Sequence, residues 1–254
     1  MRLSSQGSHG GVAFRVRSST DAPYGASGAS PAASRSDHTL AGAAVIMVAA
    51  FVSSRLTGLL RDIAVTYQFG TGREMDAYLA AIRVPDLVFQ VFAGGAVASA
   101  FIPVFARFLA TGDRDSAWRL VSSLLNLSVL VLLPVIALLI ALAEPLMALL
   151  GAGFDAGTRG LATELARLLM LSPLFFTLGC FVTSVLNANQ RFALGALAPV
   201  SYNLGIVGGA LLLAPAYGIH GLAIGALAGS LLFLLVQLPG LPRVGMRYLP
   251  VLDL

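Results

Sequence analysis

The chain has 254 residues, of which 57% are hydrophobic and 11% are charged, and its mean hydropathy is +0.85. Soluble domains carry about 25% charged residues, and so few charges do not cover the surface of a soluble protein. The composition therefore excludes an ordinary soluble enzyme and favours a membrane protein. The 16 basic residues are all arginine. Because they are scattered between apolar runs, we interpret them as topology signals and expect no nucleic-acid partner.

Residues 1–37 differ in composition from the rest of the chain. They are rich in serine, glycine and alanine, and they contain four arginines but no apolar run. A segment of this kind cannot bury a hydrophobic core. We therefore predict a disordered tail over residues 1–37, on the cytoplasmic side of the membrane.

The apolar runs that follow predict a lobe of six transmembrane helices over residues 38–242. The first two are expected at 39–68 and 76–108, and the last two at 194–213 and 219–238. The third has its uncharged core at 121–142 and ends at Gly151-Ala152-Gly153, and the fourth has its uncharged core at 168–186. The last four have uncharged cores of about 20 residues, enough to cross a hydrocarbon layer of about 30 Å. Helices follow from this length and from the need to satisfy every backbone polar group internally in lipid. The predicted fold class is therefore all-α, a polytopic membrane helix bundle.

The fifth and sixth predicted helices carry many glycines. Gly205, Gly208 and Gly209 lie in the fifth helix. In the sixth, glycines at 221, 225 and 229 are spaced by four residues and share one face. Small residues let membrane helices approach closely. We interpret these glycines as a packing face, and a hinge for conformational change is the alternative.

The placement of arginine predicts the orientation of the bundle. The N-terminal tail, the connections after the second and fourth helices, and the C-terminal segment carry ten arginines, whereas the opposite side carries three. Cytoplasmic segments are enriched in basic residues. We therefore expect both termini to lie in the cytoplasm.

Charged residues interrupt the first two predicted helices. Arg55, Arg61 and Asp62 lie in the first helix, and Arg83 and Asp86 lie one turn apart in the second. Charges inside spanning helices are costly and usually face a cavity or each other. One interpretation is a set of buried ion pairs, including Arg83 with Asp86, or of side chains that reach the interface. The other is a cavity that receives an anion, because the guanidinium fork matches phosphate oxygens.

The sequence contains no motif for a catalytic, cofactor or metal site. It has no nucleophile elbow, phosphate-binding loop, zinc-ligand spacing or dinucleotide fingerprint. The histidines His9, His38 and His220 are isolated, and Cys180 is a lone cysteine within an apolar run. We expect no enzymatic activity, no cofactor and no bound metal.

Several motifs resemble those of the MurJ (MviN) family. The most specific block runs from Ser54-Arg55-Leu56-Thr57-Gly58-Leu59-Leu60-Arg61-Asp62 through Phe69-Gly70-Thr71-Gly72 to Asp76-Ala77-Tyr78. Further matches are Arg83-Val84-Pro85-Asp86-Leu87, Ala100-Phe101-Ile102-Pro103-Val104, and Leu186-Asn187-Ala188-Asn189-Gln190-Arg191-Phe192. The resemblance covers approximately residues 40–250.

The resemblance implies a lipid II flippase of the bacterial cytoplasmic membrane. Its implied fold is that of the multidrug/oligosaccharidyl-lipid/polysaccharide exporter superfamily. Such a protein moves an undecaprenyl-diphosphate-linked peptidoglycan precursor between leaflets, with two six-helix lobes around a cavity. By motif, Arg55, Arg61, Asp62 and Asp76 match positions that matter in the family. With Arg83 from the charge pattern, they form the predicted binding site for a lipid-linked diphosphate.

The sequence departs from the family pattern at three places. Phe89 and Gln90 stand where the family usually carries arginine, and Gly94 stands where it carries an acidic residue. The chain also ends at Leu254, where a second lobe is expected, so we interpret residues 243–254 as a cytoplasmic linker. A partial flippase, or one completed by a partner that supplies the other half, is our first interpretation. The alternatives are a non-transporting membrane scaffold and an exporter of another lipid-linked oligosaccharide or a drug.

Overall fold

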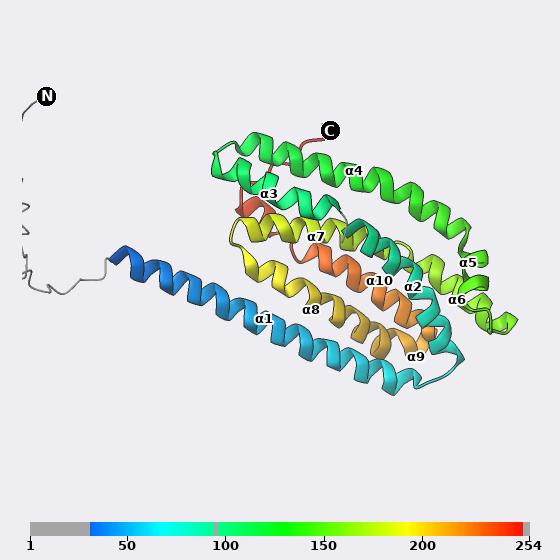
Figure 1. The fold of residues 1–254 in the computed structure, drawn as a ribbon. Helices are drawn as coiled ribbons and strands as arrows, with labels where there is room; N and C mark the ends of the chain where they lie inside the picture. Colours follow the sequence, from blue (N-terminus) through cyan, green and yellow to red (C-terminus); the bar gives the residue numbers. More distant parts are fainter. Residues whose placement is uncertain (1–30, 94–95, 251–254) are drawn as a thin grey trace, which may run out of the picture. The chain divides into compact units, whose positions relative to one another are not determined.

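The computed structural model describes residues 31–93 and 96–250 (Figure 1). It divides the chain into two units, Met1–Thr39 and Leu40–Leu254, and the helix bundle lies in the second unit. All secondary structure in the described residues is helical. The all-α prediction is therefore confirmed.

The helices in chain order are α1 (Pro31–Phe69), α2 (Arg73–Ala93), α3 (Ala96–Ala110), α4 (Arg114–Ala141), α5 (Ala143–Leu150), α6 (Ala156–Leu169), α7 (Ser172–Ala188), α8 (Phe192–Gly208), the π-helix η1 (Gly209–Leu213), α9 (Ala214–Tyr217), α10 (Ile219–Leu235) and α11 (Gly240–Arg243). Within the described residues, four stretches are long and apolar enough to cross a membrane, namely Arg114–Ala141, Ala156–Ala188, Phe192–Tyr217 and Ile219–Arg243. The last three contain the uncharged cores that the sequence predicts, and the first ends at Ala141, one residue before the end of its predicted core.

The first two predicted helices differ from the structure in their boundaries. The predicted second helix corresponds to two helices, α2 and α3, on either side of residues 94 and 95. α1 begins at Pro31, so residues 31–37 belong to a helix and not to the predicted tail. Residues 1–30 lie outside the described part of the chain, and their disorder stays a prediction.

The helices of the second unit bury two clusters of apolar side chains. The larger cluster comes mainly from α2, α6 and α10. A second cluster joins α3, α4 and α7 through aromatic residues such as Phe101, Phe105 and Trp118. In Figure 1, α10 lies between α7 and α8, and α1 runs beside α8.

The connections between helices gather at opposite ends of this unit. At one end, Arg73 after the α1–α2 turn lies 3.8 Å from Asp155 before α6, and His220 of α10 lies 3.2 Å from Glu164 of α6. Hydrogen bonds from Thr158 hold the pKa of Asp155 below its usual value. At the other end, the segment after α11 contacts α4, where the Leu249 amide donates to the Ser122 hydroxyl at 3.0 Å.

The glycines of α8, η1 and α10 form a close helix–helix contact. A Cβ added at Gly209 would lie 2.6 Å from the Cα of Gly225 and 2.7 Å from the backbone oxygen of Gly221. A Cβ at Gly205 would meet the backbone of Gly229 in the same way. Real Cβ atoms do not approach backbone this closely, so only glycine permits this spacing. The packing interpretation is confirmed for Gly205, Gly209, Gly221, Gly225 and Gly229, but not for Gly208, which has no atom within 4 Å of an added Cβ.

Two adjacent glycines give a matched test of this contact. Gly209→Ala places a methyl group against the backbone of α10, and we expect a destabilisation of about 1–3 kcal/mol from overpacking. Gly208→Ala places the same methyl group where no atom lies within 4 Å, and we expect no loss of stability. The measurement is the thermal unfolding midpoint of the purified variants in one detergent. Equal midpoints for the two variants would contradict the role of the close contact.

Candidate functional site

Arg61 lies on α1 with its guanidinium held by two neighbours. Its Nε and one Nη nitrogen donate to the same carboxylate oxygen of Asp62, at 3.0 and 2.8 Å. The other Nη nitrogen donates to the amide oxygen of Asn203 on α8 at 3.2 Å. A guanidinium has five N–H groups, so these three bonds leave two for a further acceptor. The side chains of Arg61 and Asp62 are 33% and 64% exposed, so an incoming ligand reaches both.

Asn203 ties α8 to α1 at this point. It is buried, and its amide nitrogen lies 3.4 Å from both the backbone oxygen of Ser54 and the hydroxyl oxygen of Thr57. It lies roughly opposite the glycine face of α8, because 100° per residue separates successive side chains on a helix. The close contact with α10 therefore fixes the position from which Asn203 reaches Arg61.

Two hollows adjoin the Arg61–Asp62 pair. The first, of about 460 Å³, is lined by Phe51, Ser54, Arg55, Gly58, Leu59, Arg61, Asp62 and Asn203. The second, of about 330 Å³, reaches across to α2 and α8, where Tyr78 and Tyr202 belong to its lining. Because both hollows are lined by Arg61 and Asp62, the pair stands where they adjoin.

Arg55 joins Arg61 in the first hollow. Its guanidinium carbon lies 5.0 Å from the centre of the Phe51 ring, in cation–π geometry. The Arg55 side chain is exposed. The structure therefore brings three of the predicted site residues, Arg55, Arg61 and Asp62, into one hollow.

Asp76 and Arg83 lie apart from this hollow, on α2. With Asp86 and Gln90 they are exposed, and their intervals of seven, three and four residues place all four on one helix face. The pairing of Arg83 with Asp86, which one of the two interpretations includes, is not found. The described residues show no ion pair for either side chain, nor for Asp76. Exposed side chains that face water lose little by remaining apart.

The charges therefore divide between the two helices. On α1, Arg55 and Arg61 outnumber Asp62, and on the exposed face of α2, Asp76 and Asp86 outnumber Arg83. The excess of positive charge coincides with the hollow at Arg61. An anionic group consequently fits against α1 better than against α2.

An aromatic cluster occupies the position where the family resemblance implies an arginine. Phe89 packs against Phe176 of α7, with ring centres 5.3 Å apart. Phe176 in turn contacts Tyr202 and Phe233, at 4.9 and 5.3 Å. Tyr202 lines the second hollow, so the aromatic cluster borders the site. The other departure, Gly94, lies outside the described residues.

Sequence reasoning missed Asn203, Tyr78 and Tyr202. Asn203 gave an available signal, since an amide side chain in the apolar run of a spanning helix usually bonds to a neighbouring helix. Tyr78 stands in the family motif, but the motif assigns it no role. Tyr202 gave no signal, because an aromatic residue in a membrane helix is ordinarily a packing residue.

The chain matches known proteins over most of its length. The family model described as lipid II flippase MurJ matches residues 65–254. The lipid II flippase MurJ of Burkholderia cenocepacia is 31% identical over 208 residues, which cover 80% of this chain and 40% of that protein. The protein of the same name from Thermosipho africanus is 35% identical over 179 residues, covering 70% of this chain and 37% of that protein. The chain thus spans about two fifths of the length of these curated relatives.

Solved structures agree with the sequence matches. A lipid II flippase MurJ in an inward closed conformation superposes with a TM-score of 0.68 at 31% identity, over 82% of this chain and 44% of that one. A multidrug resistance MATE family transporter of the MOP superfamily, outward-facing, superposes with a TM-score of 0.66 at 16% identity, over 84% of this chain and 46% of that one. The second match shows a shared fold. From its sequence, its apolar helices and its fold, this chain is a multi-pass membrane protein that belongs to the lipid II flippase MurJ family.

Proposed function

We propose that the chain takes part in flipping lipid II across the bacterial cytoplasmic membrane, with the diphosphate of the lipid bound at Arg61. The observation that carries this proposal is the position of Arg61. Its guanidinium is fixed by Asp62 and Asn203, keeps two N–H groups for an acceptor and opens onto two hollows. Bidentate contact with phosphate oxygens is the chemistry for which such a guanidinium is suited. The proposed role is transport, which requires no chemical reaction at this site.

The exposed face of α2 supports the presence of a second half of the transporter. Asp76, Arg83 and Asp86 on a spanning helix are costly against lipid, so we propose that this face borders a polar cavity. The described helices line one side of such a cavity, and alternating access needs a second helix bundle to close the other side. The proposed partner is therefore a second lobe, in the same protein or in another.

A scaffold without transport activity is the second candidate. The observation that favours it is Phe89, which replaces a cavity charge with an aromatic contact to Phe176. In that case the fold and its packing remain, and the Arg61–Asp62 pair serves the stability of α1. The variants described below separate this candidate from a flippase.

The orientation of the bundle is also a proposal, with both termini in the cytoplasm. It rests on the arginines of the α3–α4 and α7–α8 connections and of the C-terminal segment, which gather at one end. In a Cys180→Ala background, Thr20→Cys and Pro250→Cys are expected to resist a membrane-impermeant thiol reagent in intact cells. Thr71→Cys in the opposite turn is expected to react. Labelling of Pro250→Cys together with protection of Thr71→Cys would contradict the proposal, because the termini would then lie outside the cytoplasm.

The flippase role is tested at Arg61. In cells depleted of their own lipid II flippase, the chain in its native genetic context is expected to sustain lipid II export, and Arg61→Ala is expected to abolish it. On purified protein, loss of a charged bidentate contact of about 2 kcal/mol weakens lipid II binding about 30-fold. The lipid II affinity of Arg61→Lys is expected to lie between those of the wild type and Arg61→Ala, because an ammonium keeps the charge but lacks the fork geometry.

A double variant distinguishes ligand binding from an ion-pair role. If Arg61 serves only to neutralise Asp62, then Asp62→Ala restores the stability lost in Arg61→Ala. If Arg61 binds the diphosphate, the double variant stays unable to bind lipid II whatever its thermal midpoint. A stable Arg61→Ala protein with unchanged binding would reject the ligand role and support the scaffold.

Asn203 is expected to act as a positioning residue for Arg61. Asn203→Leu removes the acceptor at 3.2 Å and the contacts with Ser54 and Thr57, at an expected cost of about 1 kcal/mol in stability. Lipid II binding is expected to weaken more than stability alone explains. Asn189→Ala, which removes only a local bond to the Val185 carbonyl, is the control and is expected to retain binding. Full lipid II affinity in Asn203→Leu would exclude the positioning role.

A further inference from the structure

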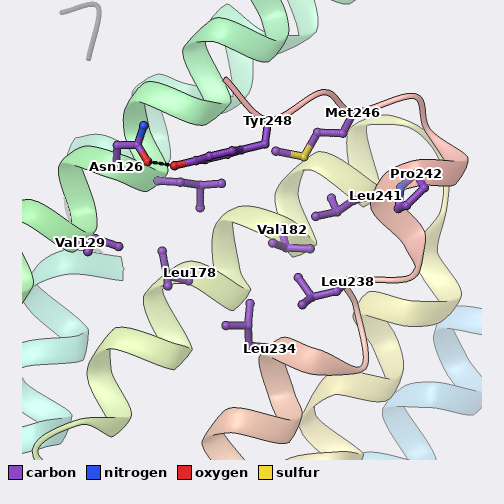
Figure 2. A pocket seen from close by; sticks show the side chains of 11 residues that line it. Asn126, Val129, Leu178, Val182, Leu234, Leu238, Leu241, Pro242, Met246 and Tyr248 are labelled. Carbon is purple, nitrogen blue, oxygen red and sulfur yellow. Dashed lines mark hydrogen bonds between the residues drawn. The ribbon is translucent and has the colours of Figure 1, made fainter. Parts of the chain in front are cut away.

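A third hollow, lined mainly by apolar side chains, lies away from the Arg61 site, between α4, α7 and the end of α10 (Figure 2). Its volume is about 460 Å³. Each of the three helical segments contributes two apolar side chains one turn apart, namely Leu125 and Val129, Leu178 and Val182, and Leu234 and Leu238. The hollow is therefore a slot whose walls run along the helices, and we call it the α4–α7 slot.

The slot exists because α4 covers α7 only partly. Of the most apolar 18-residue window of α4, 11% is buried in the described unit. The slot is open to its surroundings, which for a spanning helix are hydrocarbon chains. An apolar gap in contact with lipid is filled by an alkyl chain, because the lining atoms gain dispersion contacts that an empty gap lacks.

One end of the slot is polar. The hydroxyl of Tyr248 donates to the side-chain oxygen of Asn126 at 2.6 Å, and this bond is visible in Figure 2. Together with the bond from Leu249 to Ser122, it holds the segment after α11 against α4. That segment therefore covers one end of the slot and leaves the apolar walls uncovered along the helices.

Arginines surround this polar end. Arg243 follows the lining residue Pro242, and Arg247 lies between the lining residues Met246 and Tyr248. Arg114 of α4 is near the same segment, since its guanidinium lies 3.8 Å from where a Cβ on Gly245 would stand. All three arginines are exposed, and none forms an ion pair within the described chain. Of the nearby acids, Asp113 is engaged in capping α4 through its bond from Ser116.

We propose that the α4–α7 slot binds an anionic phospholipid of the surrounding membrane, with one acyl chain between the helices and the phosphate at Arg243 and Arg247. Basic residues beside a gap between membrane helices are the general arrangement for anionic headgroups. The volume lies within the range of about 300–1,000 Å³ that encloses a ligand of drug size. It admits a hydrocarbon chain. The bound lipid would anchor the segment after α11 to α4.

Native mass spectrometry of the purified full chain tests the proposal, with phosphatidylglycerol and phosphatidylcholine of equal chain length as probes. The wild-type protein is expected to retain phosphatidylglycerol in preference to phosphatidylcholine. Val129→Trp fills the slot and is expected to abolish retention of both. Leu130→Trp changes the neighbouring residue, which is exposed on α4, and is expected to leave retention unchanged. Circular dichroism of both variants shows whether Val129→Trp folds.

The charge contribution is tested without filling the slot. Arg243→Gln and Arg247→Gln are each expected to reduce phosphatidylglycerol retention about fivefold and to leave phosphatidylcholine retention unchanged. Arg159→Gln, at the opposite end of the bundle, is the matched control with no expected effect. Equal retention of the two lipids by the wild type, or full retention in a folded Val129→Trp protein, would overturn the proposal. Displacement of phosphatidylglycerol by undecaprenyl phosphate at equal concentration would also overturn it, since the occupant would then be an isoprenoid.

Discussion

The arrangement of this bundle depends on the close contact between α8 with η1 and α10. Glycine at 205, 209, 221, 225 and 229 removes the side chains that would separate the two helices. In a membrane there is little hydrophobic force between helices, so backbone proximity and dispersion contacts must supply the stabilisation. Because the contact leaves no room for a methyl group, it also fixes the rotation of α8 about its axis. The rotation of α8 in turn determines where the side chains on its opposite side point.

The candidate site depends on this geometry. Asn203 points from α8 toward α1, where it bonds Arg61 and reaches Ser54 and Thr57. Most side chains of α1 whose burial the structure describes are exposed, including large apolar residues such as Leu56 and Leu59. A few polar contacts therefore hold the arginine-bearing helix against α8. The candidate site combines the fixed support of α8 and α10 with a lightly packed α1.

The sequence allowed prediction of the elements whose signal is local. The four spanning stretches follow from uncharged runs, and the glycine face follows from the spacing of four at residues 221–229. The breaks at Leu142 and at Met170–Leu171 were not predicted. Pro145 and Pro173 follow them closely, but proline also lies inside α2, α4 and α8 without ending those helices, so proline alone does not mark a break in a membrane helix. Arg61 with Asp62 was accessible as a pair of sequence neighbours. Asn203, 142 positions from Arg61, becomes part of the site only through tertiary packing, and the isolated Arg83 and Asp86 show that helical spacing alone does not establish a pair.

The adjacency of Arg61 and Asp62 also bears on how the protein is made. In the proposed topology, α1 enters the bilayer during synthesis long before α8 exists, since the contact between Arg61 and Asn203 spans 142 residues of chain. An isolated guanidinium in the hydrocarbon region is costly at that stage. The carboxylate of Asp62 neutralises it from within the same helical turn, so the first helix carries its own counterion into the membrane. The later arrival of α8 then needs only to add a neutral amide to a pair that is already compensated.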